Sequence, residues 1–126
     1  MKFTLEPPSP SYAGNGSNAK LVWDYSEDKP GDLLGIVYSV KESGGAFTDM
    51  LLKNPDGTVT PYPSLPDAYK QGRVRIEGRA TFVLENVTPQ DSTLFRCALK
   101  ARSGGDKSSI VNLVVTGVFS VRYICY

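Results

Sequence analysis

The sequence predicts an all-β fold, a sandwich or barrel of about nine short strands. Twelve glycines and nine prolines interrupt the 126 residues at short intervals. Between them lie short runs rich in Val, Leu, Ile, Phe, Tyr and Thr, which are the residues favoured in strands. No stretch has the 3.6-residue period of a long helix, and many short strands with frequent turns are typical of all-β architectures.

Alternation of apolar and polar residues places the strands and their inward faces. The expected strands span residues 3–6, 18–26, 33–41, 47–53, 58–62, 73–77, 80–87, 93–101 and 109–116. The residues expected to point inward are Ala19, Leu21, Trp23 and Tyr25 in the second strand, Leu34, Ile36, Tyr38 and Val40 in the third, and Phe82 and Leu84 in the seventh.

Length and composition indicate one globular domain over residues 1–126, with a core at about 3–117 and a C-terminal extension at 118–126. The formal net charge is +1, which gives no electrostatic footprint for nucleic acid. No signal peptide is visible, and the longest apolar stretch, residues 110–121, is too short to span a bilayer. Any membrane anchor is therefore expected outside this sequence.

The composition gives little support for catalysis or metal binding. The chain has no histidine and only two cysteines, so it lacks the commonest general base and cannot form a four-cysteine zinc site. A thiol nucleophile would have no histidine to activate it, and the acidic residues are scattered over turns. We expect a protein that is not an enzyme and that needs no cofactor or metal.

One stretch resembles a known family. The pattern Phe82-x-Leu84-x-x-Val87, a short corner, and then Asp91-x-Thr93-x-Phe95-x-Cys97 is similar to the E–F region of immunoglobulin V-type domains. The resemblance implies a two-sheet Greek-key sandwich, and a bidentate salt bridge from Arg73 to Asp91 that closes its base. The alternative is that both charges are merely solvated.

The departures from that family are equally informative. Cys97 should bond to a cysteine on strand B, but that strand has none, and alternation places Trp23 about there. The usual tryptophan of strand C is also missing, and Ile36 or Tyr38 is expected to occupy its position in the core. Phe95 replaces the usual tyrosine, so the corner hydroxyl bond cannot form. We interpret Trp23 as a packing substitute, because burying it contributes a few kcal/mol, similar to the ~2–4 kcal/mol of a disulfide.

The partner of Cys97 stays open. Cys125 lies well beyond the last strand, and at about 3.3 Å per extended residue the tail must double back to reach Cys97. Either the two form a disulfide, or Cys97 is a buried free thiol and Cys125 pairs elsewhere.

A V-type domain without both core hallmarks resembles the membrane-distal domains of cnidarian allorecognition receptors. That resemblance implies an extracellular receptor ectodomain that binds the same receptor on an opposing cell, to distinguish self from non-self. The alternative is a heterophilic immune-receptor V domain that binds a different protein.

Two kinds of surface feature accompany this interpretation. In V domains the outer face of strands G, F, C, C′ and C″ is often the docking face, so the resemblance implies a binding face there. Alternation predicts its outward residues, among which Val37, Phe47 and Leu51 would form a contiguous exposed apolar patch, although a one-residue slip in register would bury them. The expected residues of this face are Val37, Ser39, Phe47, Asp49, Leu51 and Arg96. The glycosylation candidates are Asn15 in Asn15-Gly16-Ser17 and Asn86 in Asn86-Val87-Thr88, both at expected turns. The charged loops 26–32 and 102–107 are a second candidate surface.

Overall fold

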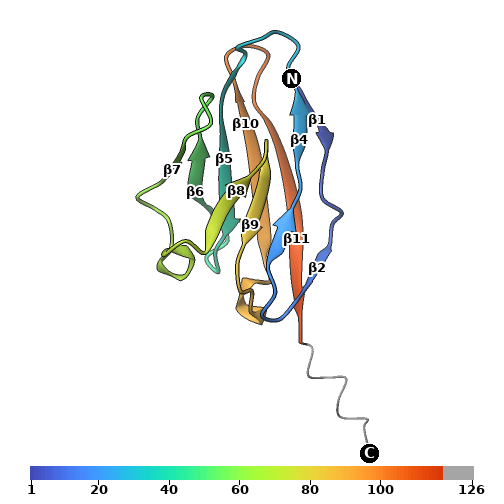
Figure 1. The fold of residues 1–126 in the computed structure, drawn as a ribbon, viewed down its shortest axis with the longest axis vertical. Coiled ribbons are helices and arrows are strands. Elements are labelled where there is room, and N and C mark those ends of the chain that lie inside the picture. Colours follow the sequence, from blue (N-terminus) through green and yellow to red (C-terminus); the bar gives the residue numbers. More distant parts are fainter. Residues whose placement is uncertain (118–126) are drawn as a thin grey trace, which may run out of the picture.

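The computed structural model describes residues 1–117, which form two sheets packed face to face (Figure 1). The strands are β1 (Lys2–Leu5), β2 (Ser11–Gly14), β3 (Ala19–Leu21), β4 (Asp24–Ser26), β5 (Leu33–Lys41), β6 (Phe47–Lys53), β7 (Val59–Pro61), β8 (Val74–Glu77), β9 (Thr81–Leu84), β10 (Leu94–Ala101) and β11 (Lys107–Thr116). Two short 3₁₀ helices are η1 (Asp67–Tyr69) and η2 (Pro89–Asp91). The predicted all-β sandwich is therefore confirmed.

One layer is a six-stranded sheet in the order β2-β11-β10-β5-β6-β7. The other contains β3-β9-β8 and the pair β1-β4, which belong together because only Val22 and Trp23 separate β3 from β4. The N-terminal segment changes layer: β1 pairs with β4, and after the prolines at 7, 8 and 10, β2 pairs in parallel with β11. Prolines suit such a crossing because they cannot continue a strand ladder. β2 was not predicted from the sequence, and β3 and β4 were predicted as one strand.

A β-bulge in β5 turns one residue that was predicted to point inward toward the surface. Lys100 pairs with Gly35 but Ala101 pairs with Leu33, so Leu34 is an extra residue on β5. Leu34 is 44% exposed, whereas Ile36, Tyr38 and Val40 are buried. The prediction for Leu34 is wrong because simple alternation does not account for an inserted residue.

Five aromatic rings form a row through the core. Their centroids are 6.1 Å apart for Trp23 and Tyr38, 5.6 Å for Tyr38 and Phe82, 5.7 Å for Phe82 and Phe95, and 6.4 Å for Phe95 and Tyr69. The first four rings alternate between the two layers, so Tyr38 and Phe82 each lie between two rings of the opposite layer. Aromatic pairs contribute about 0.5–1.5 kcal/mol each beyond the area that they bury.

Trp23 contacts both cross-strand neighbours of Cys97. Cys97 pairs with Tyr38 on β5 and with Ser109 on β11. The Trp23 ring packs on Tyr38, and its Nε1–H donates to Ser109 Oγ at 2.9 Å. Tyr38 in turn donates its hydroxyl proton to the carbonyl of Ala80 on the facing layer at 2.8 Å. These contacts place the indole in the inter-sheet space beside the thiol, where a strand B cysteine is absent.

The charged corner closes the base. Arg73 Nη2 donates to Asp91 Oδ2 at 2.9 Å, and the same oxygen accepts the main-chain N–H of Thr88 at 2.9 Å. Asp91 is buried. The pair is not the bidentate fork that was expected, because the other guanidinium donors bind the main-chain carbonyls of Ala68 and Glu85. Arg73, which directly precedes β8, therefore connects η1, the segment after β9 and η2.

The first prediction concerns Trp23. Trp23→Ala should lower the free energy of unfolding by roughly 3–5 kcal/mol, because it leaves a large cavity between the sheets. The exposed neighbour Val22 is the control, and Val22→Ala should change the free energy of unfolding by less than about 0.5 kcal/mol. Urea denaturation measures both, and equal losses would contradict the proposed role of Trp23.

The second prediction concerns pH. Burial raises the pKa of the Cys97 thiol from 9.0 to about 12. Below pH 9 the thiol is neutral in both states and contributes no pH dependence. Between pH 9 and pH 12 the unfolded chain loses this proton first, so stability should fall as pH rises, by at most ~1.4 kcal/mol per pH unit from this group.

Urea denaturation under reducing conditions tests this expectation across pH 8–12. The free energy of unfolding of Cys97→Ala should fall less steeply with pH than that of the unmodified protein. Parallel slopes would show that Cys97 ionises equally in both states. The comparison uses slopes because the smaller alanine also costs stability at every pH.

Candidate binding face

The outer face of the six-stranded sheet is the principal candidate site. On β10, Phe95, Cys97 and Leu99 point into the core, so Arg96 and Ala98 point outward. Cross-strand pairing then carries the outward row from Arg96 to Ile110 on β11 and to Ser39 on β5, and from Ser39 to Asp49 on β6. We call the outward residues Ser39, Phe47, Asp49, Leu52, Arg96 and Ile110 the outer face.

Arg96 is the centre of this face. Its guanidinium carbon lies 4.5 Å from the centroid of the Phe47 ring, a cation–π contact. Nη2 approaches Ser39 Oγ at 3.4 Å and Asp49 Oδ1 at 3.8 Å, while Ser39 Oγ donates to Asp49 Oδ1 at 2.7 Å. The Nε atom is buried without a hydrogen-bond partner. The arginine is thus held in place by the ring and is only loosely paired.

A second β-bulge, in β6, changes which residues lie on the outer face. Tyr38 pairs with Leu51 but Ser39 pairs with Asp49, which leaves Met50 as an extra residue in β6. Asp49 consequently points outward, whereas Leu51 is buried in the core. The prediction that Leu51 is an exposed apolar residue is therefore wrong.

Val37 and Ser39 do lie on the outer side of β5, but neighbouring side chains cover them. Val37 is 5% exposed between its cross-strand partners Leu52 and Ala98, and Ser39 is fully buried between Asp49 and Arg96. The contiguous apolar patch that was expected from Val37, Phe47 and Leu51 does not exist. Phe47, Asp49 and Arg96 are half-buried and reach the surface.

The sequence analysis missed two apolar residues of this sheet. Ile110 is 49% exposed beside Arg96, and Leu52 covers Gly35, where an added Cβ would lie 2.9 Å from the Leu52 Cδ1 atom. Alternation predicts Ile110, because its neighbours Val111 and Leu113 belong to the core. Nothing in the sequence signals Leu52, whose direction depends on the bulge at Met50.

Hydrogen bonds connect the two charged loops, 26–32 and 102–107, to each other. Asp32 Oδ1 accepts the main-chain N–H of Ser103 at 3.0 Å and its hydroxyl at 2.9 Å, and the Arg102 N–H donates to the Asp32 carbonyl at 2.7 Å. The amino terminus contacts Asp28 Oδ2 at 2.7 Å. The loops 26–32 and 102–107 therefore form one connected end of the sandwich.

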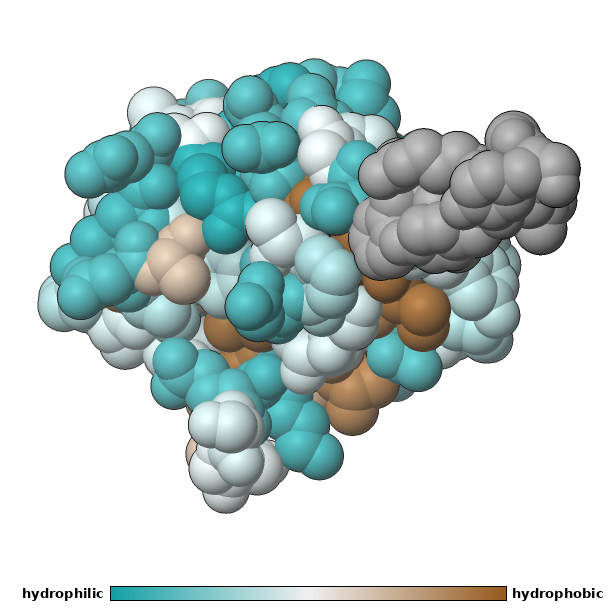
Figure 2. All heavy atoms as spheres, turned by 90° about the horizontal axis from the view of Figure 1, so that it is seen from below, coloured by the Kyte–Doolittle hydropathy of each residue, from teal (hydrophilic) through white to brown (hydrophobic). Residues whose placement is uncertain are grey.

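Both sequons lie at the other end. Asn15 and Asn86 are exposed, and their turns are bonded together, because Gly16 N–H donates to the Val87 carbonyl at 2.7 Å and Val87 N–H to the Ser17 carbonyl at 2.9 Å. Asn15 N–H also binds the carbonyl of Thr116, where β11 ends. Viewed from this end, the described surface is mostly hydrophilic (Figure 2).

Other chemistry is sparse in the described part of the chain. Cys97 is buried and bonds to no other cysteine within residues 1–117, and Cys125 lies outside the described residues, so both alternative pairings stay predictions. Residues 1–117 hold no cluster of three or more His, Cys, Asp or Glu side chains suited to a metal ion. Neither helix of this region has the length and hydropathy to cross a bilayer.

The comparison with solved structures supports the fold. No family profile and no curated protein matches the sequence. The crystal structure of murine CEACAM1b is similar, with a TM-score of 0.64 and 14% identity over 86% of this chain and 51% of that chain. The likeness thus spans about half of the CEACAM1b chain, and such low identity establishes a shared fold alone. The described chain has the fold of an immunoglobulin V-type sandwich, without a disulfide between strands B and F.

Proposed function

We propose that this chain is an extracellular recognition domain of a cell-surface receptor, and that it binds the same receptor on an opposing cell to distinguish self from non-self. The observation that carries the proposal is the outer face, where a loosely paired Arg96 stands between Phe47 and Ile110. Aromatic residues and arginine are enriched at protein interfaces, and no further layer covers the outer side of this sheet within residues 1–117.

The charges on this face suit self-association. In a twofold symmetric contact the same patch is used by both copies, so any residue that meets another is met by it in return. Arg96 and Asp49 lie on the same row with a weak internal contact of 3.8 Å. A second copy that approaches about a twofold axis brings its Asp49 to Arg96 and its Arg96 to Asp49. Weak contacts of this kind suffice where many receptors act together at a cell junction.

The test uses charge exchange on protein-coated beads. Beads that carry the unmodified domain should cluster. Arg96→Glu beads and Asp49→Arg beads should each fail to cluster with themselves, because like charges that face each other cost several kcal/mol. A mixture of the two variants should cluster again, because the glutamate introduced in one variant then meets the arginine introduced in the other, while the unchanged Arg96 and Asp49 also meet.

Lys20→Glu is the control, since Lys20 lies on the opposite sheet and pairs there with Glu77. It should leave clustering unchanged. Self-clustering of both single variants would reject the outer face as the contact. Unmodified beads that never cluster would reject homophilic binding and favour the alternative, a heterophilic immune-receptor V domain, whose distinct ligand a pull-down should then recover.

Glycosylation follows from an extracellular location. When a eukaryotic cell secretes the domain, both Asn15 and Asn86 should carry an N-linked glycan, because both are exposed and lie in turns at the end remote from the loops. Mass spectrometry before and after enzymatic deglycosylation should show two glycans, and one in each of Asn15→Gln and Asn86→Gln. An unmodified mass would contradict this expectation, while bead clustering should not depend on either glycan.

A further inference from the structure

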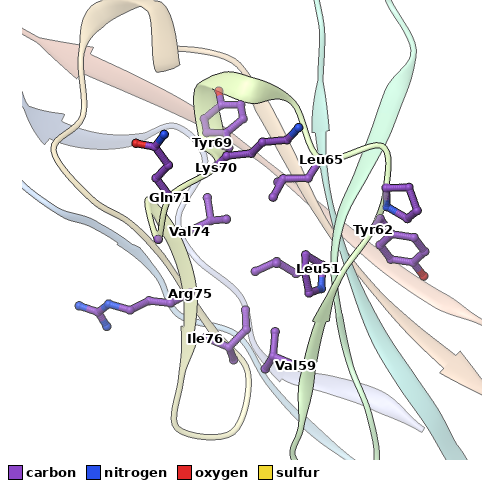
Figure 3. A pocket seen from close by; sticks show the side chains of 13 residues that line it. Leu51, Val59, Tyr62, Leu65, Tyr69, Lys70, Gln71, Val74, Arg75 and Ile76 are labelled. Carbon is purple, nitrogen blue, oxygen red and sulfur yellow. The ribbon is translucent and has the colours of Figure 1, made fainter.

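A groove opens at the edge of the sandwich between β7 and β8 (Figure 3). Its volume is about 710 Å³. Leu51 and Val74 are buried side chains at its base, and Val59 and Ile76 face each other near its lower end. The groove lies away from Arg96 and shares no residue with the outer face defined above.

The wall formed by β8 has an unpaired main-chain edge. Among residues 1–117, β8 pairs only with β9. The register is set by Val74 opposite Leu84, and the Glu85 N–H donates to the Arg73 carbonyl at 2.8 Å. Because hydrogen-bonded and non-bonded pairs alternate in an antiparallel ladder, Val74 and Ile76 direct their N–H and C=O groups away from β9. Those four groups lie along the groove.

The opposite wall includes β7, which is also an edge strand and pairs only with β6 among residues 1–117. Pro61 ends β7 and Pro63 follows closely, and both line the groove. Proline has no N–H to donate, and edge prolines prevent strands from pairing with another chain. The edge of β8 is therefore the more complete one for bonding a further strand, while the wall formed by β6 and β7 supplies apolar contact from Leu51 and Val59.

The charges that line the groove are all positive. Lys70 and Arg75 are its charged residues, and no carboxylate lines it. Arg75 points away from the groove (Figure 3) and is held by Glu77 and Glu85. Lys70 lies at the rim, and its partner among residues 1–117 is Asp67, whose side chain is 94% exposed. Surface pairs of this kind contribute about 0–1 kcal/mol, so a carboxylate of a ligand competes readily for Lys70.

We propose that this groove binds an extended segment of a partner protein, which adds to β8 as an extra strand. The main-chain groups of Val74 and Ile76 bond the segment. Every second side chain of the segment is apolar and enters the groove beside Leu51 and Val59, because side chains in a strand alternate between two faces. A carboxylate of the segment lies beside Lys70.

The probe is a phage-displayed library of random 12-residue peptides, selected on the folded domain. Enriched peptides should show alternating apolar residues and at least one Asp or Glu. A synthetic copy of one such peptide should slow amide hydrogen exchange at Val74 and Ile76 by at least tenfold. Failure to enrich any peptide would overturn the proposal, and binding that leaves both amides unprotected would exclude strand addition.

Variants locate the bound peptide. Val59 is 39% exposed on the groove wall, and Val22 is 41% exposed outside it, so the two give a matched pair. Val59→Asp should weaken binding by at least tenfold and Val22→Asp by less than twofold; equal effects would place the peptide elsewhere. Lys70→Glu should also weaken binding. If dilution of the free domain exposes Val74 and Ile76 amides that were protected at high concentration, the occupant is a second copy and the assignment to a partner peptide is wrong.

Discussion

The contact between the two sheets depends on the row of rings that runs from Trp23 to Tyr69. Because Trp23, Tyr38, Phe82 and Phe95 come alternately from the two layers, neither sheet can shift without opening a cavity beside a large ring, and close-packed interiors resist such cavities. Trp23 and Tyr38 also carry polar groups that find partners on Ser109 and Ala80. Trp23 therefore fills the inter-sheet space beside Cys97.

Two bulges determine what the outer sheet presents. The extra residue at Met50 turns Leu51 into the core and leaves Asp49 outside, next to Ser39. The extra residue at Leu34 releases a leucine to the surface near the loops. Each bulge reverses the direction of the side chains on one side of it, so the composition of the face changes with no change in the strands themselves. The resulting face is centred on a charged, ring-stacked arginine in place of an apolar patch.

The molecule offers two surfaces with different physical bases for recognition. The outer face presents side chains, Arg96, Phe47 and Ile110 among them, and its specificity comes from the position of charges and rings. The groove presents a main-chain edge, which any extended segment can bond, and its selectivity comes from the apolar walls and from Lys70.

Sequence reasoning predicted the all-β sandwich, most of its strands and the depth of Trp23, because glycine and proline positions and apolar alternation are local signals. The closeness of Arg73 and Asp91 came from a resemblance, and the missing strand B cysteine was visible at once. Alternation wrongly predicted that Leu34 points inward and that Leu51 and Val37 are exposed. Neither Tyr69 as the fifth ring nor the open edge of β8 was predicted. The sequence by itself determined which residues form strands and that the inter-sheet space holds aromatic rings. Only the tertiary structure decided which side chains face outward and which edge stays unpaired, because both depend on register between strands that lie far apart in the chain.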